Sequence, residues 1–365
     1  MSILFSAFQC GPLEFNNRIV VSPMCQYSAV DGSASDWHLQ HLMNLAMSGA
    51  GLITVEATAV EPEGRITHGD LSLCSDANEE ALARVLKAAR SVAPSGTKFA
   101  IQLGHAGRKA SSQRPWEGGG ALSKNEGAWT TVAPSAVAFA EGWHTPEALD
   151  EAGLDRVRAA FVDSARRAAR LGFEVIDLHL AHGYLLHQFH SPLSNHRTDQ
   201  WGGDQDRRRA YPLSIARAMR AALPAHVLLS ARITGSDWTA DGIGPDEAVA
   251  MAKALKDEGV GMVCLTSGGL VSNAQIKAGP GYQVPFAETV RRETGLATQA
   301  VGLISGIDQA ESIVSDGRAD FVALARALLD DPRWPWQAAR RLGADIETPV
   351  QYRRAVPPAW PGRAA

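Results

Sequence analysis

The sequence Phe173-Glu174-Val175-Ile176-Asp177-Leu178 runs directly into His179-Leu180-Ala181-His182-Gly183-Tyr184, and this junction indicates the fold class. The first six residues are mostly apolar and include β-branched side chains, which predicts a short buried strand. Leu171-Gly172 precedes them, as expected where a helix ends in a left-handed glycine cap. A helix, a glycine, a buried strand and a polar loop form one unit of a parallel α/β protein.

The same unit recurs along the chain, and we expect eight strands. The predicted strands cover residues 18–21, 51–55, 98–103, 173–178, 227–233, 261–266, 297–301 and 320–324. Segments with apolar residues at helical spacing lie between them, at 81–91, 154–171, 206–223, 245–258, 286–293 and 307–315.

Eight consecutive units can form a closed (β/α)8 barrel or an open doubly wound sheet. The open sheet that binds dinucleotides carries a G-x-G-x-x-G fingerprint at the start of a helix, and this sequence has none. We therefore predict an α/β fold of the (β/α)8 TIM barrel type, as a single domain over residues 1–365. The long insertion 111–147 follows the third strand and is expected to cap the active site.

The composition argues against several classes of function. The 365 residues carry a net charge of -4 without a basic block, so nucleic acid is not an expected partner. The four cysteines are scattered without a C-x-x-C pair, which favours neither a disulfide framework nor a zinc site. No apolar run approaches the ~18 residues of a membrane span, and the first residues lack a signal-peptide layout. We expect a cytoplasmic protein without a membrane partner.

Polar residues lie near the end of the predicted strands or directly after them, at the end of a barrel where active sites lie. In chain order they are Ser22-Pro23-Met24-Cys25-Gln26-Tyr27, Glu56-Ala57-Thr58, Gln102 with His105, Arg108 and Lys109, then His179, His182 and Tyr184, Arg232, Ser267-Gly268-Gly269, Gly302, and Ala325-Arg326.

The seventh and eighth strand ends indicate a phosphate site. Barrels often bind phosphate with these two loops and a short extra helix. Gly302 leaves backbone N–H groups accessible, and Arg326 provides a guanidinium group suited to phosphate oxygens. The alternative for Arg326 is a surface salt bridge.

The spacing His179-x-x-His182 leaves three interpretations open. Zinc is disfavoured because the pair leaves a strand and no third ligand is close in sequence, so no metal is predicted. The second interpretation is structural, with the two histidines packed at the edge of the core and their hydrogen bonds satisfied there. The functional interpretation is two N–H donors directed at one substrate oxygen, with Tyr184 on the same loop as an acid.

Six motifs lie in order along nearly the whole chain: 22–27, Glu56-Ala57-Thr58-Ala59-Val60 with Gly64-Arg65-Ile66, 101–108, 179–184, 191–199, and Gly281-Tyr282-Gln283-Val284. Together they resemble the Old Yellow Enzyme family, in its thermophilic-like branch that includes xenobiotic reductases. Two features are similar to those of that branch. One is Cys25, at a position where many relatives carry Thr, and the other is the pair of histidines.

The resemblance implies a tightly bound FMN cofactor and a substrate site beside it. Ser22, Pro23, Met24 and Cys25 are expected to line the isoalloxazine, Ala57 to flank it, Gln102 to bond its pyrimidine edge, Arg232 to lie near N1 and O2, and Gly302, Ala325 and Arg326 to hold the phosphate. His179 and His182 would bind the substrate carbonyl, Tyr27 would help bind substrate, Tyr184 would donate a proton, and Cys25 would tune the flavin.

The implied reaction has two halves, in which NADPH or NADH reduces FMN and FMN then reduces an activated alkene. Enones, enals and maleimides are the expected substrates, with nitro compounds in some cases. A rival barrel enzyme, such as an aldolase or isomerase, would need a Schiff-base lysine or a carboxylate base, and neither is well placed. A flavin-storage protein would have little need for Tyr184 beside two histidines.

The segment Gln351-Tyr352-Arg353-Arg354 resembles the tail that, in this branch, reaches a neighbouring active site as an arginine finger. Arg354 is the candidate, Trp360 is the alternative, and a disordered basic end is the third possibility. The resemblance therefore implies a homodimer or homotetramer in which the tail 349–365 reaches a neighbouring subunit.

Overall fold

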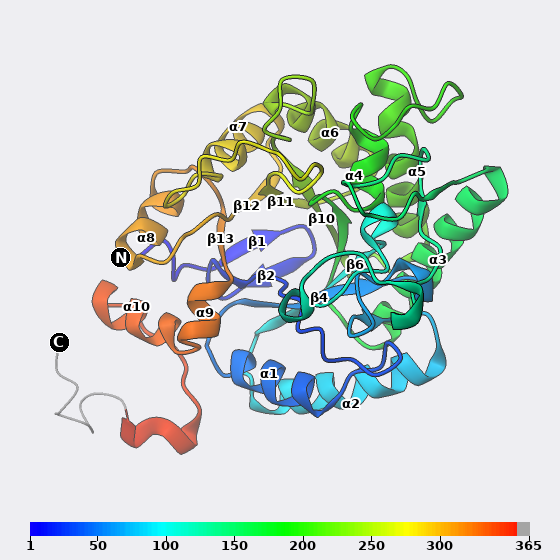
Figure 1. The fold of residues 1–365 in the computed structure, drawn as a ribbon. Helices are drawn as coiled ribbons and strands as arrows, with labels where there is room; N and C mark the ends of the chain where they lie inside the picture. The colour runs from blue at the N-terminus through cyan, green and yellow to red at the C-terminus, as the bar shows by residue number, and fades with distance from the viewer. Residues whose placement is uncertain (356–365) are drawn as a thin grey trace.

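The computed structural model describes residues 1–355, and within them eight parallel strands close into a barrel (Figure 1). The ring is closed because β13 pairs with β3, and β3 pairs in turn with β4. The predicted (β/α)8 barrel is confirmed. In order around the barrel the strands are β3 (Ile19–Val21), β4 (Leu52–Ala59), β6 (Lys98–Gly104), β9 (Val175–Leu180), β10 (Leu228–Thr234), β11 (Met262–Thr266), β12 (Ala297–Ala300) and β13 (Phe321–Leu324).

Helices surround the barrel (Figure 1), and side-chain caps begin several of them. Ser75, Asp150 and Asp204 each accept a hydrogen bond from a backbone N–H in the first turn of α2, α3 and α5. The outer helices are α1 (Asp36–Ala46), α2 (Asp76–Val92), α3 (Glu151–Arg170), α5 (Gln205–Ala222), α6 (Pro245–Asp257), α7 (Val284–Thr294) and α8 (Ile307–Ser315).

Four helices were not among the predicted segments: α1, α4 (Leu185–His190), α9 (Arg326–Asp330) and α10 (Trp334–Leu342). Two of them, α4 and α9, are too short to show helical periodicity in the sequence. Both lie at the ends of barrel strands, α4 after β9 and α9 after β13. The two short helices therefore stand within the segments after β9 and β13 that were expected to be loops.

The amino-terminal end of the barrel is closed by an antiparallel hairpin of β1 (Phe8–Cys10) and β2 (Leu13–Phe15). Its side chains pack in one buried cluster with residues from the beginnings of the strands, such as Val20 and Leu52. Phe8 and Phe15 both contact Phe321 edge to face, with ring centroids 5.2 and 5.1 Å apart. This end of the barrel is therefore filled, and the open end is the carboxyl end.

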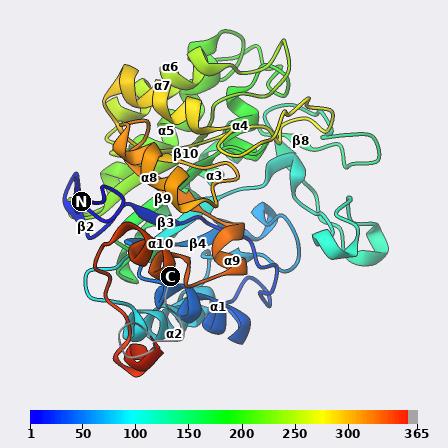
Figure 2. The same cartoon turned by 90° about the vertical axis from the view of Figure 1, so that its left-hand side faces the viewer.

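The insertion 111–147 stands out from the barrel and contains two short 3-10 turns (Figure 2). Its strand β7 (Val132–Ala133) pairs with β8 (Glu147–Ala148). Trp116, in the first turn, packs edge to face against Tyr27 with ring centroids 5.7 Å apart. The insertion thus contacts the loop after β3, as expected for a capping segment.

The carboxyl-terminal segment leaves the barrel in a short turn over Val350–Ala355, where Arg354 is exposed. Tyr352 packs against Trp336 of α10, with ring centroids 6.2 Å apart. Trp360 lies outside the described residues. Across residues 1–355, no helix combines the length and apolar character needed to cross a membrane.

Loss of the Phe321 ring should weaken the closed end of the barrel. Phe321→Ala removes a fully buried ring that two aromatic side chains contact, so we expect the free energy of unfolding to fall by about 3–5 kcal/mol. Urea denaturation measures this. Val30→Ala, at an exposed position, should change it by about 0.5 kcal/mol or less. Equal effects of the two substitutions would contradict this account of the core.

Candidate active site

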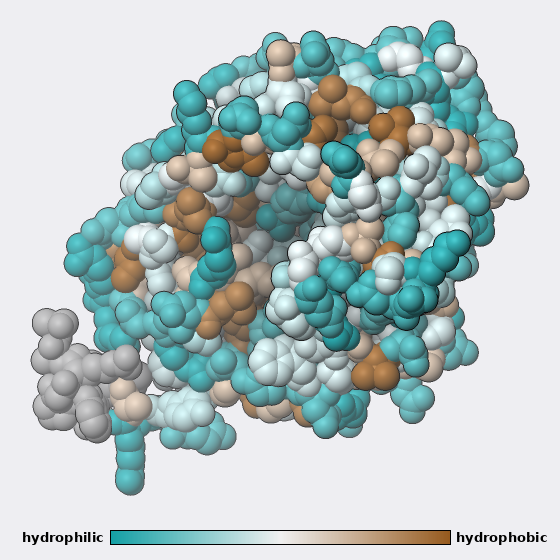
Figure 3. Space-filling model, in the orientation of Figure 1, coloured by the Kyte–Doolittle hydropathy of each residue, from teal (hydrophilic) through white to brown (hydrophobic). Residues whose placement is uncertain are grey.

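Two cavities open at the carboxyl end of the barrel, and most predicted site residues line one of them. This face of the molecule is hollowed at its centre (Figure 3). The larger cavity, of about 580 Å³, is within the range of cofactor sites. Of the predicted residues it is lined by Ser22, His182, Arg232, Gly302, Ala325 and Arg326.

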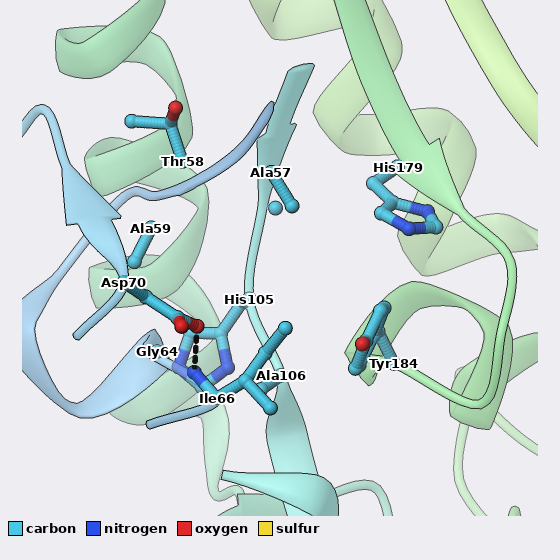
Figure 4. A pocket seen from close by; sticks show the side chains of 11 residues that line it. Ala57, Thr58, Ala59, Gly64, Ile66, Asp70, His105, Ala106, His179 and Tyr184 are labelled. Carbon is cyan, nitrogen blue, oxygen red and sulfur yellow. Dashed lines mark hydrogen bonds between the residues drawn. The ribbon is translucent and has the colours of Figure 1, made fainter. Parts of the chain in front are cut away.

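The smaller cavity brings together Ala57, His179 and Tyr184. His179 and Tyr184 lie on one side of it, and Ala57 and Asp70 lie on the other (Figure 4). His179, in β9, lines the smaller cavity and His182, in the loop after β9, lines the larger one, so the cavities lie to either side of this histidine pair.

The loops after β12 and β13, where the sequence predicts a phosphate site, line one part of the larger cavity. Gly302 has a φ of +110°, and a Cβ there would lie 3.0 Å from the Cβ of Gln283. Only glycine fits this position without strain. Arg326 begins α9 and is exposed, and it forms no ion pair with any residue of 1–355. The surface salt bridge considered for Arg326 is thus not formed, and its guanidinium group is available for an anion.

Arg232 provides the main test of whether this cavity suits a flavin. Its Nε is buried and has no hydrogen-bond partner within the described part of the chain. The same holds for Ser267 Oγ and Gln283 Oε1, which line the same cavity. Unpaired buried polar atoms are costly, so a cavity lined by several of them fits a polar ligand. A cation there suits the ring edge at which a reduced flavin carries negative charge.

Gln102 is buried and is not among the residues that line the two cavities. Its Nε2 donates to Asp177 Oδ2 at 2.8 Å, and Ser230 Oγ donates to Asp177 Oδ1 at 2.7 Å. In the sheet register Gln102 lies beside Ala57. One amide hydrogen is therefore used within the protein, and the other amide hydrogen and the oxygen remain for a ligand.

The two histidines form a hydrogen-bonded row that ends on β11. Ala181 N donates to His179 Nδ1 at 3.2 Å. His179 Nε2 lies 3.3 Å from His182 Nδ1, and His182 Nε2 lies 2.9 Å from Thr266 Oγ1. Burial, followed by the positive charge of Arg232, holds the pKa of both imidazoles well below the usual range. Both rings are therefore neutral near pH 7.

The loop that carries His182 is fixed by contacts that the sequence patterns did not predict. Lys109 Nζ donates to the backbone oxygens of His182 and Gly269, both at 2.9 Å. Burial and then the charge of Arg108 lower the pKa of Lys109 to about 8. Gly183 N donates to His187 Nδ1 at 2.9 Å.

The conformation of this loop is tight as well as hydrogen-bonded. His182 has a φ of +58°, in the left-handed region that few side chains adopt. Gly183 follows with a φ of +74°, and a Cβ there would lie 2.1 Å from the Gly269 oxygen. Deeper in the protein, His187 Nε2 lies 2.9 Å from Asp237 Oδ1. The direction of the His182 ring thus depends on close contact between the β9 and β11 loops.

Tyr184 packs edge to face against His179, with ring centroids 5.0 Å apart. Burial is the main cause that raises the pKa of Tyr184 well above its usual value, and the nearby Cys25, Tyr27 and Asp70 act in the same direction. The phenol therefore stays protonated at neutral pH. Burial likewise raises the pKa of Cys25, so that it is a thiol.

Two buried carboxyl groups face the loop after β3. Glu56 occupies a register shift in β4, and its Oε2 accepts from Gln26 N at 3.1 Å. Asp70 Oδ2 accepts from Ile66 N at 2.6 Å, and burial raises the pKa of Asp70 to about 7. Glu56 was noted at a strand end, but nothing in the sequence pattern singled out Asp70. Among residues 1–355, His, Cys, Asp and Glu side chains do not gather in a group that could hold a metal ion.

A methyl group at Gly183 should force the two loops apart. In Gly183→Ala the new carbon meets a backbone oxygen at 2.1 Å, whereas in Gly172→Ala, which also has positive φ, it meets nothing within 4 Å. Both substitutions carry the cost of a left-handed alanine, about 1–2 kcal/mol. We expect Gly183→Ala to lower the free energy of unfolding by a further 1–3 kcal/mol or so. Equal losses in urea denaturation would show that the loop contact is unimportant.

Comparisons with known proteins agree with the resemblance. Residues 3–345 match the NADH:flavin oxidoreductase / NADH oxidase family. The NADPH dehydrogenases of Geobacillus thermodenitrificans and Bacillus subtilis are 42% and 40% identical to this chain, and the alignments cover 97% and 96% of it and 98% of each relative.

Among solved structures, morphinone reductase superposes with a TM-score of 0.78 at 25% identity, covering 95% of this chain and 91% of that one. A 2-naphthoyl-CoA reductase complex superposes with a TM-score of 0.84 at 20% identity, over 95% of this chain and 53% of that one, which shows a shared fold. The expected resemblance is confirmed, and the chain belongs to the NADH:flavin oxidoreductase / NADH oxidase family, as an FMN-dependent NAD(P)H oxidoreductase of the Old Yellow Enzyme type.

Proposed function

We propose that the protein reduces the carbon–carbon double bond of α,β-unsaturated carbonyl compounds. Enones, enals and maleimides are the proposed substrates, and nitro compounds are a further class. The observation that carries this proposal is the pair of neutral imidazoles, His179 and His182, with the protonated Tyr184 packed against His179. The two imidazoles can polarise a substrate carbonyl by donating hydrogen bonds to it, and Tyr184 can supply a proton.

The residues that we assign to FMN come from six of the barrel strands. Arg232 would contact the ring edge that becomes anionic, and Gln102 would bond the pyrimidine edge. The full assignment is Ser22, Pro23, Met24, Cys25, Ala57, Gln102, Arg232, Gly302, Ala325 and Arg326. When bound, FMN supplies the hydride of the reaction.

His179 and His182 are assigned to the substrate carbonyl oxygen. As the double bond is reduced, negative charge develops on that oxygen, and a preorganised N–H donor stabilises it. One such donor typically contributes about 2.7–4 kcal/mol to the transition state. Because burial and Arg232 keep both rings neutral, they act as hydrogen-bond donors and do not protonate the oxygen.

Tyr184 is assigned as the acid that protonates the α-carbon. Its raised pKa keeps the proton on Oη until carbanion character develops at that carbon. Tyr27, which contacts Trp116 of the insertion, is assigned to substrate binding. Cys25 remains a thiol, so its proposed influence on the flavin is that of a weak neutral donor.

The names of the relatives support the choice of hydride donor. The bacterial relatives are called NADPH dehydrogenases, and a morphinone reductase 25% identical to this chain was solved with tetrahydroNAD. We propose NADPH or NADH as the donor here. We also propose that the chain works as a homodimer or homotetramer, in which the exposed Arg354 of the tail enters a neighbouring active site.

Lys109 bears on the rival aldolase reaction, which needs a lysine amine free to attack a substrate carbonyl. Its lowered pKa suits such a nucleophile. Its Nζ, however, donates to two backbone oxygens, and Lys109 is not among the described residues that line the two cavities. This arrangement favours a structural role for Lys109.

The proposed function is tested with the purified protein under anaerobic conditions. We expect a yellow protein that releases FMN on denaturation, is bleached by NADPH and regains its colour with cyclohexenone. Bleaching by NADPH without recolouring by cyclohexenone, maleimide or a nitroalkene would overturn the proposed substrate class.

Tyr184→Phe should separate the two halves of the reaction. The substitution removes the proposed proton donor but keeps the ring against His179, so we expect slower reduction of cyclohexenone with unchanged bleaching by NADPH. Stopped-flow absorbance measures both rates. The expected decrease is about 10²–10⁴-fold, the usual contribution of a positioned acid.

Tyr211→Phe is the matched control, because the Tyr211 hydroxyl donates to the Leu154 oxygen in the protein interior. It should leave both rates unchanged. If Tyr184→Phe slowed both half-reactions equally, its role would be structural.

A further inference from the structure

The hydrogen bonds along the His179–His182 row fix which nitrogens carry protons in this structure. His179 Nδ1 accepts from Ala181 N, so the proton of this neutral ring must be on Nε2. That proton faces His182 Nδ1 at 3.3 Å, which makes His182 Nδ1 an acceptor. The proton of His182 is then on Nε2, which donates to Thr266 Oγ1 at 2.9 Å. The two hydrogen bonds between side chains are therefore donated in one direction, from His179 on β9 through His182 to Thr266 on β11.

This direction conflicts with the role that we assign to His182. Its Nδ1 is the nitrogen beside His179, and in this state it has no proton to give to a substrate oxygen. For both rings to donate to one carbonyl oxygen, His182 must carry its proton on Nδ1. Its Nε2 then has a lone pair, and a buried acceptor that lacks a partner is costly.

Thr266 is suited to both states of the ring. A hydroxyl can accept a hydrogen bond or donate one, and it changes between the two by rotation. Thr266 is 2% exposed and is the last residue of β11, and its backbone oxygen is held by Gly235 N at 2.7 Å. The side chain is thus fixed in place while its hydroxyl hydrogen can turn.

We propose that Thr266 is a positioning residue whose hydroxyl allows His182 to exchange one tautomer for the other when a carbonyl substrate binds. This inference rests on the proposed function. In the exchange one proton leaves Nε2 to water and one is taken up from water at Nδ1, so the charge of the ring does not change. The Thr266 hydroxyl, which accepted from Nε2, then donates to it.

The contacts of the His182 ring favour a change of tautomer over a rotation of the ring, because a half-turn about the Cβ–Cγ bond would set carbon atoms against His179 Nε2 and Thr266 Oγ1. Lys109 Nζ donates to the backbone oxygens of both His182 and Gly269, which holds the two loops together. His182 Nε2 therefore remains beside Thr266 in both states. Substrates that offer a hydrogen-bond acceptor, such as a carbonyl or nitro oxygen, would drive the exchange, whereas a simple alkene would not.

The first test observes the imidazole nitrogens directly. Long-range ¹⁵N–¹H spectra of the FMN-loaded enzyme, with His182 assigned from a His182→Gln variant, distinguish the two tautomers. We expect the Nε2–H form without ligand and the Nδ1–H form with bound cyclohexenone or a phenol. An unchanged His182 tautomer with bound ligand would overturn the proposal, and this result needs no substitution at Thr266.

The second test compares Thr266→Val, which removes the hydroxyl at nearly constant shape, with Thr266→Ser, which keeps it. We expect Thr266→Val to slow cyclohexenone reduction up to about tenfold, the range of one neutral hydrogen bond, with unchanged bleaching by NADPH. Thr266→Ser should restore the wild-type rate. Wild-type rates in Thr266→Val, or a loss that Thr266→Ser does not restore, would overturn the proposal.

Two further variants separate this inference from the proposed function. Thr294→Val removes a buried hydroxyl that donates to the Val290 oxygen at the end of α7, and it should leave both rates unchanged. His182→Ala should slow enone reduction. If His182→Ala has no effect, the proposed carbonyl site is wrong; if it slows the reaction but Thr266→Val does not, only the role of Thr266 is wrong.

Discussion

The buried ammonium group of Lys109 joins two backbone loops, and the geometry of the active site depends on that bridge. Its two hydrogen bonds, to the oxygens of His182 and Gly269, hold the end of β9 against the end of β11. Gly183 allows a backbone approach that no side chain would tolerate. Within this contact His182 adopts an unfavourable left-handed conformation, and its ring contacts Thr266.

A second constraint is electrostatic. One half-buried cation, Arg232, lines the cavity assigned to the flavin and also lowers the pKa of His179 and His182. The same positive charge can stabilise a reduced flavin and keep both histidines neutral. Neutral rings can donate hydrogen bonds in either tautomer, whereas a charged ring would be costly to bury. In the proposed assignment, Arg232 therefore acts on both the flavin site and the substrate site.

Much of this arrangement could be predicted from the sequence, because strands of a parallel barrel end at one face. His179 and Arg326 were expected at this face because they follow predicted strands, and Arg232 because it lies near the end of one; all three line the cavities there. The roles of Lys109 and Thr266 could not be predicted, since each depends on which atoms of a distant loop lie within hydrogen-bond distance. The hairpin β1–β2 was missed for a related reason, because three-residue strands carry too little periodicity.

The proposed reaction depends on one substrate oxygen being held by His179 and His182 together. The most direct test is a crystal structure of the FMN-loaded protein with bound cyclohexenone. We expect the carbonyl oxygen to lie about 2.7–3.2 Å from both His179 Nε2 and His182 Nδ1. A carbonyl oxygen bound to another group, such as the Lys109 amine or the Tyr27 hydroxyl, with both imidazoles left to each other and to Thr266, would contradict this expectation.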